Sequence, residues 1–323
     1  MGNDKHNLRI IFMGTPGFAV PSLDILLKNN YNVVAVVTMP DKPAGRGRKI
    51  KQSPVKEYAV AHNIPVLQPT NLKSPEFLEE LKSYNANLQI VVAFRMLPEA
   101  VWNMPELGTF NLHASLLPKY RGAAPINWAI INGEKETGVT TFFLQHEIDT
   151  GDILFQEKVD IAETETAGTL HDKLMNVGAK LVLKTVKAIE NNDYELTAQD
   201  ESLACPAPKI FKKDCLIDWN DTQENIYNKI RGLSPYPAAF TYLTGKNGKK
   251  KVLKIYFAEK TGEENAAQPG TIFTDNKNFI KIATKNGLLN ITDLQLEGKK
   301  RLKIKDFLNG TDMEQYEKQL SSE

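Results

Sequence analysis

Residues 9–38 read RIIFMGTPGFAVPSLDILLKNNYNVVAVVT. The apolar run at 9–13, followed by a Gly-Thr-Pro-Gly turn, predicts a buried strand that ends in a tight turn. Leucines at helical spacing over 21–28 predict a helix, and the β-branched run at 32–38 predicts a second strand. A strand, a helix and a strand in this order indicate a right-handed crossover in a parallel sheet. The stretch therefore predicts an α/β fold.

Four more strands are expected in the first part of the chain, at residues 88–94, 108–112, 139–145 and 153–159. The turn at 149–151 makes the last two a hairpin-like pair. Ser53 followed by Pro54 is typical of a helix start, and a long amphipathic helix is expected over 169–190. Together these elements predict a Rossmann-like, mostly parallel sheet domain over residues 1–190, which would carry the catalytic site.

The sequence changes character after this helix. Residues 191–208 are polar and contain two prolines, which predicts a linker. Short alternating segments follow, separated by Gly, Lys and Asn, at residues 239–243, 252–258, 270–273, 279–283 and 288–296. Several short strands at this spacing predict a smaller C-terminal domain over residues 209–323, with an OB-like β-barrel as the expected fold.

Charge is distributed unevenly along the chain. The net charge of all 323 residues is +1, but residues 207–323 carry 20 Lys and Arg against 15 Asp and Glu. On charge balance alone, a solvated surface is the simpler interpretation. The alternative is a C-terminal module that binds a polyanion such as a nucleic acid.

Several classes of protein are excluded by composition. No apolar run is long enough to span a bilayer, and residues 1–8 lack the hydrophobic segment of a secretory signal. Cys205 and Cys215 are the only cysteines, too few for a disulfide framework or a four-thiolate zinc site. We therefore expect a cytoplasmic protein without a metal or a membrane partner. With no strong apolar face in the sequence, we expect a monomer.

Three side chains between residues 111 and 152 suit acyl transfer. Asn111 and His113 end a predicted strand, and ligands of open α/β sheets collect at the carboxyl ends of strands. Residues two apart face the same side of a strand, so a carboxamide and an imidazole share one wall. Both groups donate to a developing oxyanion when His113 is protonated, and Asp149 would orient the imidazole and favour its charged form. Such a trio transfers an acyl group without a Ser or Cys nucleophile.

Each member of this trio has a simpler structural interpretation when taken alone. An Asn at a strand end commonly forms a turn, and Asp-Thr-Gly at 149–151 is itself typical of a turn. His146 is the rival histidine, but it has no neighbouring strand-end donor and is expected to be exposed. The turn at 14–17 lacks the full Gly-x-Gly-x-x-Gly pattern, which argues against a nicotinamide cofactor.

A basic, glycine-broken insertion follows the second strand, where residues 41–49 read DKPAGRGRK. A surface loop is the simpler interpretation, although loops on a rigid scaffold commonly bind ligands. Its four cations are Lys42, Arg46, Arg48 and Lys49. Four cations within nine residues can neutralise phosphates, and Gly permits close backbone approach, so the loop is a candidate nucleic-acid contact.

Taken together, these motifs resemble the methionyl-tRNA formyltransferase family over nearly the whole chain. SLLP at 115–118, RGAAP at 121–125 and DTGD at 149–152 occur in the family's order. SLLP and DTGD alone mark the wider group of enzymes that use 10-formyltetrahydrofolate. The basic loop and the basic C-terminal barrel favour a tRNA substrate, and KI at 209–210 and IDW at 217–219 resemble the start of the family's C-terminal domain.

The resemblance implies transfer of a formyl group from 10-formyltetrahydrofolate to the α-amino group of methionine esterified to initiator tRNA. It implies that the catalytic residues are Asn111, His113 and Asp149. The residues that it assigns to the folate are Ser115, Leu116, Leu117 and Pro118. The residues that it assigns to tRNA are Lys42, Arg46, Arg48 and Lys49, with Arg46 as the best single candidate for the acceptor end. The C-terminal barrel would hold the acceptor arm through its phosphates.

The chain departs from the family pattern after the third predicted strand, where Ala-Phe-Arg at 93–95 replaces Ala-Tyr-Gly. Arg95 adds bulk and charge near the expected folate pocket. Two alternative functions remain open. One is another formyl-folate enzyme that acts on a small amine or on water, which would need no basic loop. The other is a nucleic-acid-binding protein whose α/β domain is a non-catalytic scaffold, which would predict a missing member of the trio.

Overall fold

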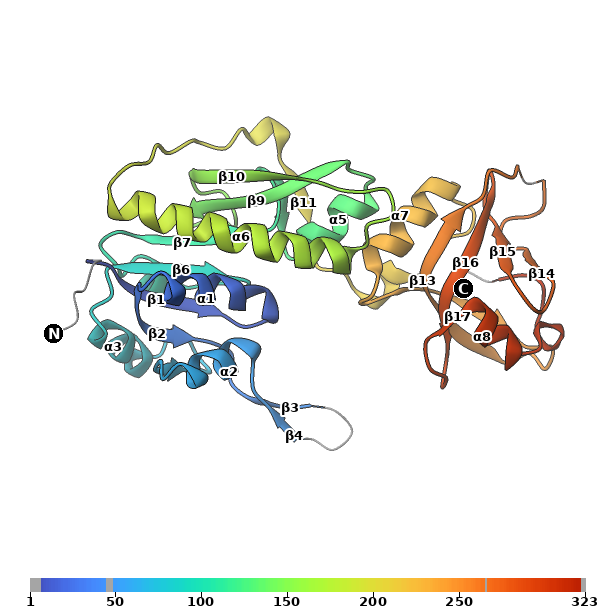
Figure 1. Cartoon of the computed structure of the whole chain (residues 1–323), viewed down its shortest axis with the longest axis horizontal. Helices are drawn as coiled ribbons and strands as arrows, with labels where there is room; N and C mark the ends of the chain where they lie inside the picture. The colour runs from blue at the N-terminus through green and yellow to red at the C-terminus, as the bar shows by residue number, and fades with distance from the viewer. Residues whose placement is uncertain (1–6, 45–48, 265, 321–323) are drawn as a thin grey trace. The chain divides into compact units, whose positions relative to one another are not determined.

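The computed structural model describes residues 7–44, 49–264 and 266–320 (Figure 1). The chain forms two compact units. The first contains residues 1–122, 136–160 and 171–206, and the second contains residues 123–135, 161–170 and 207–323. The structure groups residues 123–135 and 161–170 with the C-terminal part of the chain, although they lie inside the predicted catalytic domain at 1–190. The linker at 191–208 stays a prediction.

A seven-stranded sheet forms the centre of the first unit, in the order β10-β9-β7-β6-β1-β2-β5. Its strands are β1 (Arg9–Gly14), β2 (Asn32–Val37), β5 (Val66–Leu67), β6 (Leu88–Val92), β7 (Thr109–His113), β9 (Glu136–Phe143) and β10 (Ile153–Asp160). The pairs from β5 to β7 are parallel, and β9 and β10 add two antiparallel strands. The predicted mostly parallel α/β sheet is confirmed.

Helices pack beside this sheet, and two short strand pairs lie outside it (Figure 1). The helices are α1 (Val20–Lys28), α2 (Pro54–Ala61), α3 (Pro75–Ser83), α4 (Glu99–Trp102) and α6 (Ala167–Glu190). The strand pairs are β3 (Lys42–Ala44) with β4 (Lys49–Lys51), and β8 (Lys119–Gly122) with β11 (Cys205–Ala207). The predicted start of α2 is confirmed, since the Ser53 hydroxyl accepts a hydrogen bond from the Lys56 N–H and Pro54 is the first helical residue.

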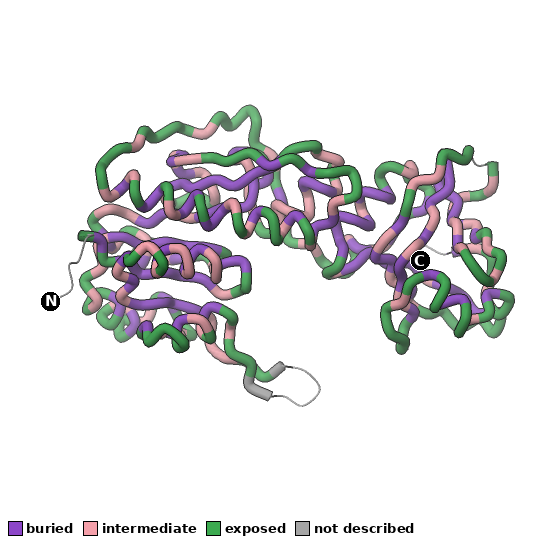
Figure 2. Tube along the Cα trace, viewed as in Figure 1, coloured by how far each residue is buried: buried purple, intermediate pink, exposed green. Residues whose placement is uncertain are grey.

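The central strands of the sheet are largely buried, as the purple trace in Figure 2 shows, and most of their side chains are apolar. β6 is buried at each of its five positions, as expected of a parallel strand covered on both sides. One cluster on the sheet includes Ile11, Met13 and Val91. On α6, the Thr185 hydroxyl bonds to the Thr141 hydroxyl of β9 at 2.8 Å. The sheet is therefore a rigid platform for the loops at its strand ends.

An antiparallel half-barrel forms the second unit, with strand order β12-β13-β16-β15-β14 and β17 paired to β16. The strands are β12 (Ala239–Thr244), β13 (Lys250–Lys260), β14 (Ile272–Thr274), β15 (Ile280–Ala283), β16 (Leu288–Leu296) and β17 (Leu302–Lys303). The helices are α5 (Pro125–Ile131), α7 (Gln223–Leu233) and α8 (Ile304–Asn309). Trp219 is buried in the core and donates to the Thr241 hydroxyl at 3.1 Å. The predicted small β domain is confirmed.

Within the residues that the structure describes, no helix is long and apolar enough to cross a membrane.

Candidate active site

Strand β7 carries two members of the predicted trio. It lies between β6 and β9, and Asn111 and His113 are separated by one residue along it. The alternation of a strand therefore directs both side chains to the same face. His113 is buried and Asn111 is half-buried. In the described part of the chain, the Asn111 carboxamide has no hydrogen-bond partner, which leaves its N–H groups free to donate to a ligand.

Asp149 lies in the loop between β9 and β10 and is brought next to His113. The His113 Nδ1 atom is 3.8 Å from the Asp149 Oδ2 atom, and both side chains are nearly buried. This distance is an ion-pair distance and exceeds that of a hydrogen bond. Oδ2 accepts a hydrogen bond from the Gly122 N–H at 2.9 Å, whereas Oδ1 has no partner among the described residues.

Orientation of the imidazole comes from a residue that the sequence analysis did not identify. His113 Nε2 lies 2.8 Å from the carbonyl oxygen of Tyr120, and because a carbonyl only accepts, Nε2 is the donor. Nδ1 then faces the Asp149 carboxylate. Both ring nitrogens therefore face oxygen acceptors. Tyr120 has a φ of 61°. The sequence did not reveal this backbone conformation, so it gave no indication that the Tyr120 carbonyl orients His113.

The segment assigned to the folate is mostly buried. Ser115, Leu117 and Pro118 are buried, and Leu116 is partly exposed. The Ser115 hydroxyl donates to the Lys119 carbonyl at 2.6 Å, so it is already used within the turn. The structure places this segment beside β9, where it forms a rigid wall with little polar side chain left to bind a ligand.

Two donors at the carboxyl ends of neighbouring strands have no partner. The Thr15 hydroxyl, after β1, and the Arg95 Nε atom, after β6, are buried without a hydrogen bond. The remaining Arg95 nitrogens donate to the carbonyls of Pro69 and Thr70, at 2.5 and 3.3 Å. Because β1 and β6 are paired, both donors belong to the same edge of the sheet. Unpaired buried donors at that edge fit a polar heterocyclic ligand.

The basic insertion begins and ends as a short hairpin. β3 and β4 pair antiparallel, with Lys42 opposite Lys51. Arg46 and Arg48 lie outside the described residues, and only the backbone of Lys49 is described. Lys42 is exposed. The base of the hairpin is held by Asp41, which accepts from Lys56 Nζ at 2.7 Å and from Gln68 Nε2 at 2.8 Å.

His146, the rival histidine, is exposed as predicted. Its side chain is 74% exposed and lies 3.5 Å from the Glu99 carboxylate, outside the trio. Within the described ranges, no group of three or more His, Cys, Asp and Glu side chains is placed to hold a metal ion.

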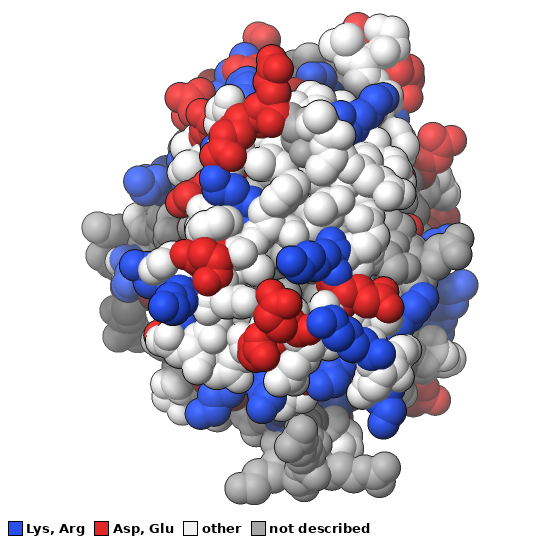
Figure 3. All heavy atoms as spheres, turned by 90° about the vertical axis from the view of Figure 1, so that its right-hand side faces the viewer, with Lys and Arg blue, Asp and Glu red and all other residues white. Residues whose placement is uncertain are grey.

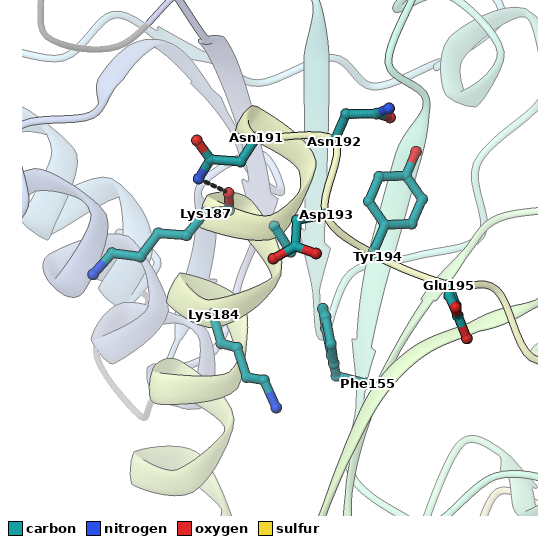
Figure 4. A pocket seen from close by; sticks show the side chains of 9 residues that line it. Phe155, Lys184, Lys187, Asn191, Asn192, Asp193, Tyr194 and Glu195 are labelled. Atoms are coloured by element: carbon teal, nitrogen blue, oxygen red, sulfur yellow. Dashed lines mark hydrogen bonds between the residues drawn. The ribbon is translucent and has the colours of Figure 1, made fainter.

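A hollow of about 630 Å³ lies elsewhere on the first unit (Figure 4). It is formed by the end of α6, the segment after it and Phe155 of β10. Two lysines of α6, Lys184 and Lys187, and two acids of the segment after it line the hollow, and Lys184 Nζ lies 4.5 Å from the centre of the Phe155 ring (Figure 4). No member of the trio lines this hollow, so we do not assign the reaction to it.

Two family profiles match the chain. One, described as formyl transferase, matches residues 8–186, and the other, described as formyl transferase C-terminal domain, matches residues 209–312. Proteins named methionyl-tRNA formyltransferase are similar over almost the full length. That of Bacteroides fragilis is 56% identical over 95% of this chain and 96% of its own, and that of Parabacteroides distasonis is 58% identical over the same shares. That of Flavobacterium johnsoniae is 57% identical over 94% of this chain and 96% of its own.

Solved structures share the fold at lower identity. The sugar 3N-formyl transferase WlaRD, solved in the presence of dTDP and 5-N-formyl-THF, has a TM-score of 0.66 and 23% identity, and covers 91% of this chain and 100% of its own. HypX from Aquifex aeolicus, in complex with tetrahydrofolic acid, has a TM-score of 0.62 and 20% identity, and covers 93% of this chain and 46% of its own. At these identities the likeness establishes the fold alone.

Proposed function

The chain belongs to the methionyl-tRNA formyltransferases, and from this premise we propose how its own residues carry out the reaction. It transfers a formyl group to methionyl-tRNA and uses a formyl-tetrahydrofolate as co-substrate. The observation that carries the function is identity of 56–58% along about 95% of the chain. We propose 10-formyltetrahydrofolate as the form used and methionyl initiator tRNA as the acceptor.

Attack on the formyl carbon begins from the neutral α-amine of the methionyl group. A new carbon–nitrogen bond forms, and the formyl oxygen becomes an oxyanion. In this proposal the Asn111 carboxamide and the Nδ1–H of cationic His113 donate to that oxyanion. Support comes from the free Asn111 amide and from the ring geometry, in which Nε2 is used on the Tyr120 carbonyl and Nδ1 is not in a close hydrogen bond.

Proton movements complete the step. The attacking amine loses a proton, and the unpartnered Oδ1 of Asp149 accepts it, directly or through water. The bond between the formyl carbon and N10 of the folate then breaks, and N10 takes a proton from His113. One proton has moved from the amine to the enzyme and one from the enzyme to the folate, so the charges balance over the reaction.

The folate would lie along the edge that carries the trio. We propose that the buried turn from Ser115 to Pro118 acts as a wall for it, with Leu116 as the exposed contact. The unpaired Thr15 hydroxyl and Arg95 Nε supply donors for a pterin-like ring. We propose Arg95 as a folate contact at this edge, at a position where the family usually has Gly.

Contacts to tRNA are proposed on both units. In the first, the basic hairpin with Lys42, Arg46, Arg48 and Lys49 would reach the acceptor end. In the second, a groove of about 740 Å³ is lined by Lys209, Lys212 and Lys254 and by two exposed aromatic rings, Phe211 and Tyr236. None of these three lysines has a carboxylate partner among the described residues. Lysines fit phosphates, and exposed rings fit unpaired bases.

One assay tests the assignment as a whole. Labelled 10-formyltetrahydrofolate is offered with methionyl initiator tRNA, with uncharged tRNA and with glycinamide ribonucleotide in parallel. We expect label on the charged initiator tRNA only. Label on glycinamide ribonucleotide, or free formate in every tube, would support the alternative formyl-folate enzyme that acts on a small amine or on water. We also propose that the protein is cytoplasmic and that it is a monomer. Sedimentation velocity of the purified chain would test the monomeric state.

A further inference from the structure

A segment near the end of the first unit returns to the loop that carries Asp149. Thr197 and Ile153 exchange two backbone hydrogen bonds, at 2.8 and 3.0 Å, which place this segment at the start of β10. We name residues 197–201 the strap. It lies far from the loop in the sequence but next to it in the structure, so its side chains reach the backbone of the turn at 149–151.

Gln199 of the strap is the side chain that contacts the turn. Its Nε2 atom donates to the Asp149 carbonyl at 2.9 Å and to the Gly151 carbonyl at 2.8 Å. An amide nitrogen carries two hydrogens, so both donors of Gln199 are used on this one turn. The two bonds fix the direction in which the backbone leaves Asp149.

Arg121 fixes the orientation of the Gln199 amide. Gln199 Oε1 accepts from Arg121 Nε at 3.1 Å and from Nη2 at 2.7 Å. Arg121 is held in turn by Glu201, whose two oxygens accept at 2.7 and 2.8 Å. A guanidinium only donates, so the amide oxygen must face Arg121 and the amide nitrogen must face the turn.

The turn needs such support because of its backbone conformation. Asp149 has a φ of 58°, in the left-handed region that residues with a side chain seldom adopt. Such conformations persist only where the surroundings hold them. The Asp149 carboxylate is held separately by the N–H of Gly122, the residue after Arg121. The side chain and the backbone of Asp149 are thus both held by contacts that involve residues 121 and 122.

We propose that Gln199 is a positioning residue for formyl transfer. Its carboxamide holds Asp149 in the conformation from which the carboxylate faces His113, and Arg121, braced by Glu201, holds the carboxamide. This inference rests on the catalytic role proposed for Asp149. In this inference Gln199 touches no substrate and acts only through the turn that carries Asp149.

The first test is Gln199→Leu, which keeps the approximate size and removes all four hydrogen bonds. Displacing a reacting group by about 1 Å costs on the order of 10²-fold in rate, so we expect kcat to fall 10- to 100-fold. KM for the folate and for tRNA should change by less than roughly two-fold, because neither is contacted. A fall in kcat at nearly constant KM is the pattern that a displaced catalytic group produces, and a general loss of folded protein would not produce it.

Gln199→Glu is a second variant of nearly unchanged shape. It keeps an acceptor for Arg121 but replaces the two donors with an oxygen that faces two carbonyls. We expect at least the same loss of kcat. The matched control is Asp200→Ala, which removes the hydrogen bonds that the Asp200 carboxylate accepts from the Ser202 N–H and hydroxyl, at 3.0 and 2.7 Å, without touching the turn. Wild-type kcat is expected for this control.

A double-mutant cycle with Asp149→Asn separates positioning from general stability. If Gln199 acts through Asp149, the double variant should be no slower than Asp149→Asn alone. Losses that multiply would overturn the inference, because they would mean an independent structural effect. Asp149→Asn with full turnover would instead refute the catalytic role of Asp149. Strong loss in Asp149→Asn together with wild-type turnover in both Gln199 variants would refute the inference and leave that role intact.

Discussion

At the scale of single residues, some polar atoms of the site are held by hydrogen bonds within the protein, and others have no partner there and can contact a substrate. The Tyr120 carbonyl and the Gly122 N–H hold one atom each of His113 and Asp149. The Asn111 carboxamide and Asp149 Oδ1 are left without partners in the described part of the chain. A preorganised donor set of this kind stabilises charge that develops only in the transition state, so it should act on kcat rather than on substrate affinity.

Removing one oxyanion donor should therefore slow turnover. We expect Asn111→Ala and His113→Ala each to lower kcat by roughly 10²- to 10³-fold, about 3–4 kcal/mol, because one donor to the oxyanion is lost. The dissociation constants for the folate and for tRNA should stay near those of the wild type. Single-turnover kinetics with separate binding measurements check this. His146→Ala, at an exposed histidine outside the trio, is the control, and a comparable loss there would contradict the assignment.

The sequence indicates Asn111, His113 and Asp149 as a trio, whose catalytic role stays a proposal, but it does not predict their geometry. Asn111 and His113 could be identified because strand alternation is a local rule. The left-handed conformation of Asp149 and the carbonyl that orients His113 are set by turns whose backbone angles are not encoded in residue type alone. Gln199 was missed for a related reason: it contacts a loop 50 residues earlier, from a segment whose polar composition is typical of a linker.

At the scale of elements, the turn between β9 and β10 depends on a glycine. A Cβ atom at Gly151 would lie 1.7 Å from the Phe143 carbonyl oxygen, so the backbone would have to move. Gly151→Ala should displace Asp149, lower kcat by at least about 10-fold, and destabilise the first unit by about 1–3 kcal/mol. Steady-state kinetics and thermal unfolding measure both. Gly262→Ala, where nothing lies within 4 Å, is the control and should match the wild type.

An ion-pair cluster on β16 makes a pH-dependent contribution to the second unit. Burial alone would raise the pKa of Asp293, but hydrogen bonds and charges from Arg301 and Lys303 lower it below its usual value. A depressed carboxylate pKa stabilises the fold above the unfolded-state value of about 3.9, and this stabilisation is lost as the pH falls through the lower folded-state pKa. Arg301 is half-exposed and Lys303 is exposed, so part of the interaction is screened by solvent.

Asp293→Asn should accordingly lower the free energy of unfolding by about 1–3 kcal/mol at neutral pH, because the charged hydrogen bonds of Arg301 are lost. The difference from the wild type should be constant between pH 5 and pH 8 and should shrink below about pH 4. Urea denaturation across this pH range measures it. Glu317→Gln, at an exposed carboxylate of the same unit, is the control, and an equal effect there would contradict the explanation.

Secondary structure was predictable where the pattern is local. β1, β2 and β6 follow mainly apolar runs, whereas β7 and the strands of the half-barrel follow alternating patterns. The β3–β4 hairpin was not predicted, because its short strands carry lysines and a proline without apolar alternation. The grouping of residues 123–135 and 161–170 with the C-terminal part was not predictable either, since it depends on contacts between distant segments and not on composition.

At the scale of the whole molecule, the lysines and arginines available to bind tRNA are those that are not already paired with a carboxylate. On the face that Figure 3 presents, Lys and Arg are interspersed with Asp and Glu. Several C-terminal cations are already neutralised: Lys260 pairs with Glu224, Lys281 with Glu263, and Arg301 with Asp293. The excess of five positive charges in residues 207–323 is therefore not a uniform basic surface. It matters most where lysines lack carboxylates and lie beside exposed rings.

The groove of the second unit has both lysines without carboxylate partners and exposed rings. It therefore predicts how the affinity for tRNA depends on the salt concentration. Each lysine that neutralises a tRNA phosphate contributes about −0.7 to −0.9 to the slope of log K against log salt. Replacing Lys209, Lys212 and Lys254 with Ala should therefore make that slope shallower by roughly 2–3, if each contacts one phosphate. Lys281→Ala should leave the slope unchanged, because Glu263 already neutralises that lysine. Filter binding at several salt concentrations measures both.

The contribution of aromatic stacking in the same groove should not depend on the salt concentration, unlike the contribution of the lysines. Tyr236 is 83% exposed and Phe211 is 54% exposed, so both rings are accessible to a base. Stacking of an unpaired base is worth about 1–3 kcal/mol. Tyr236→Ala should thus weaken tRNA binding by that amount at every salt concentration, with an unchanged slope. A changed slope would mean that the ring acts by placing the lysines, and unchanged affinity would mean that tRNA does not occupy the groove.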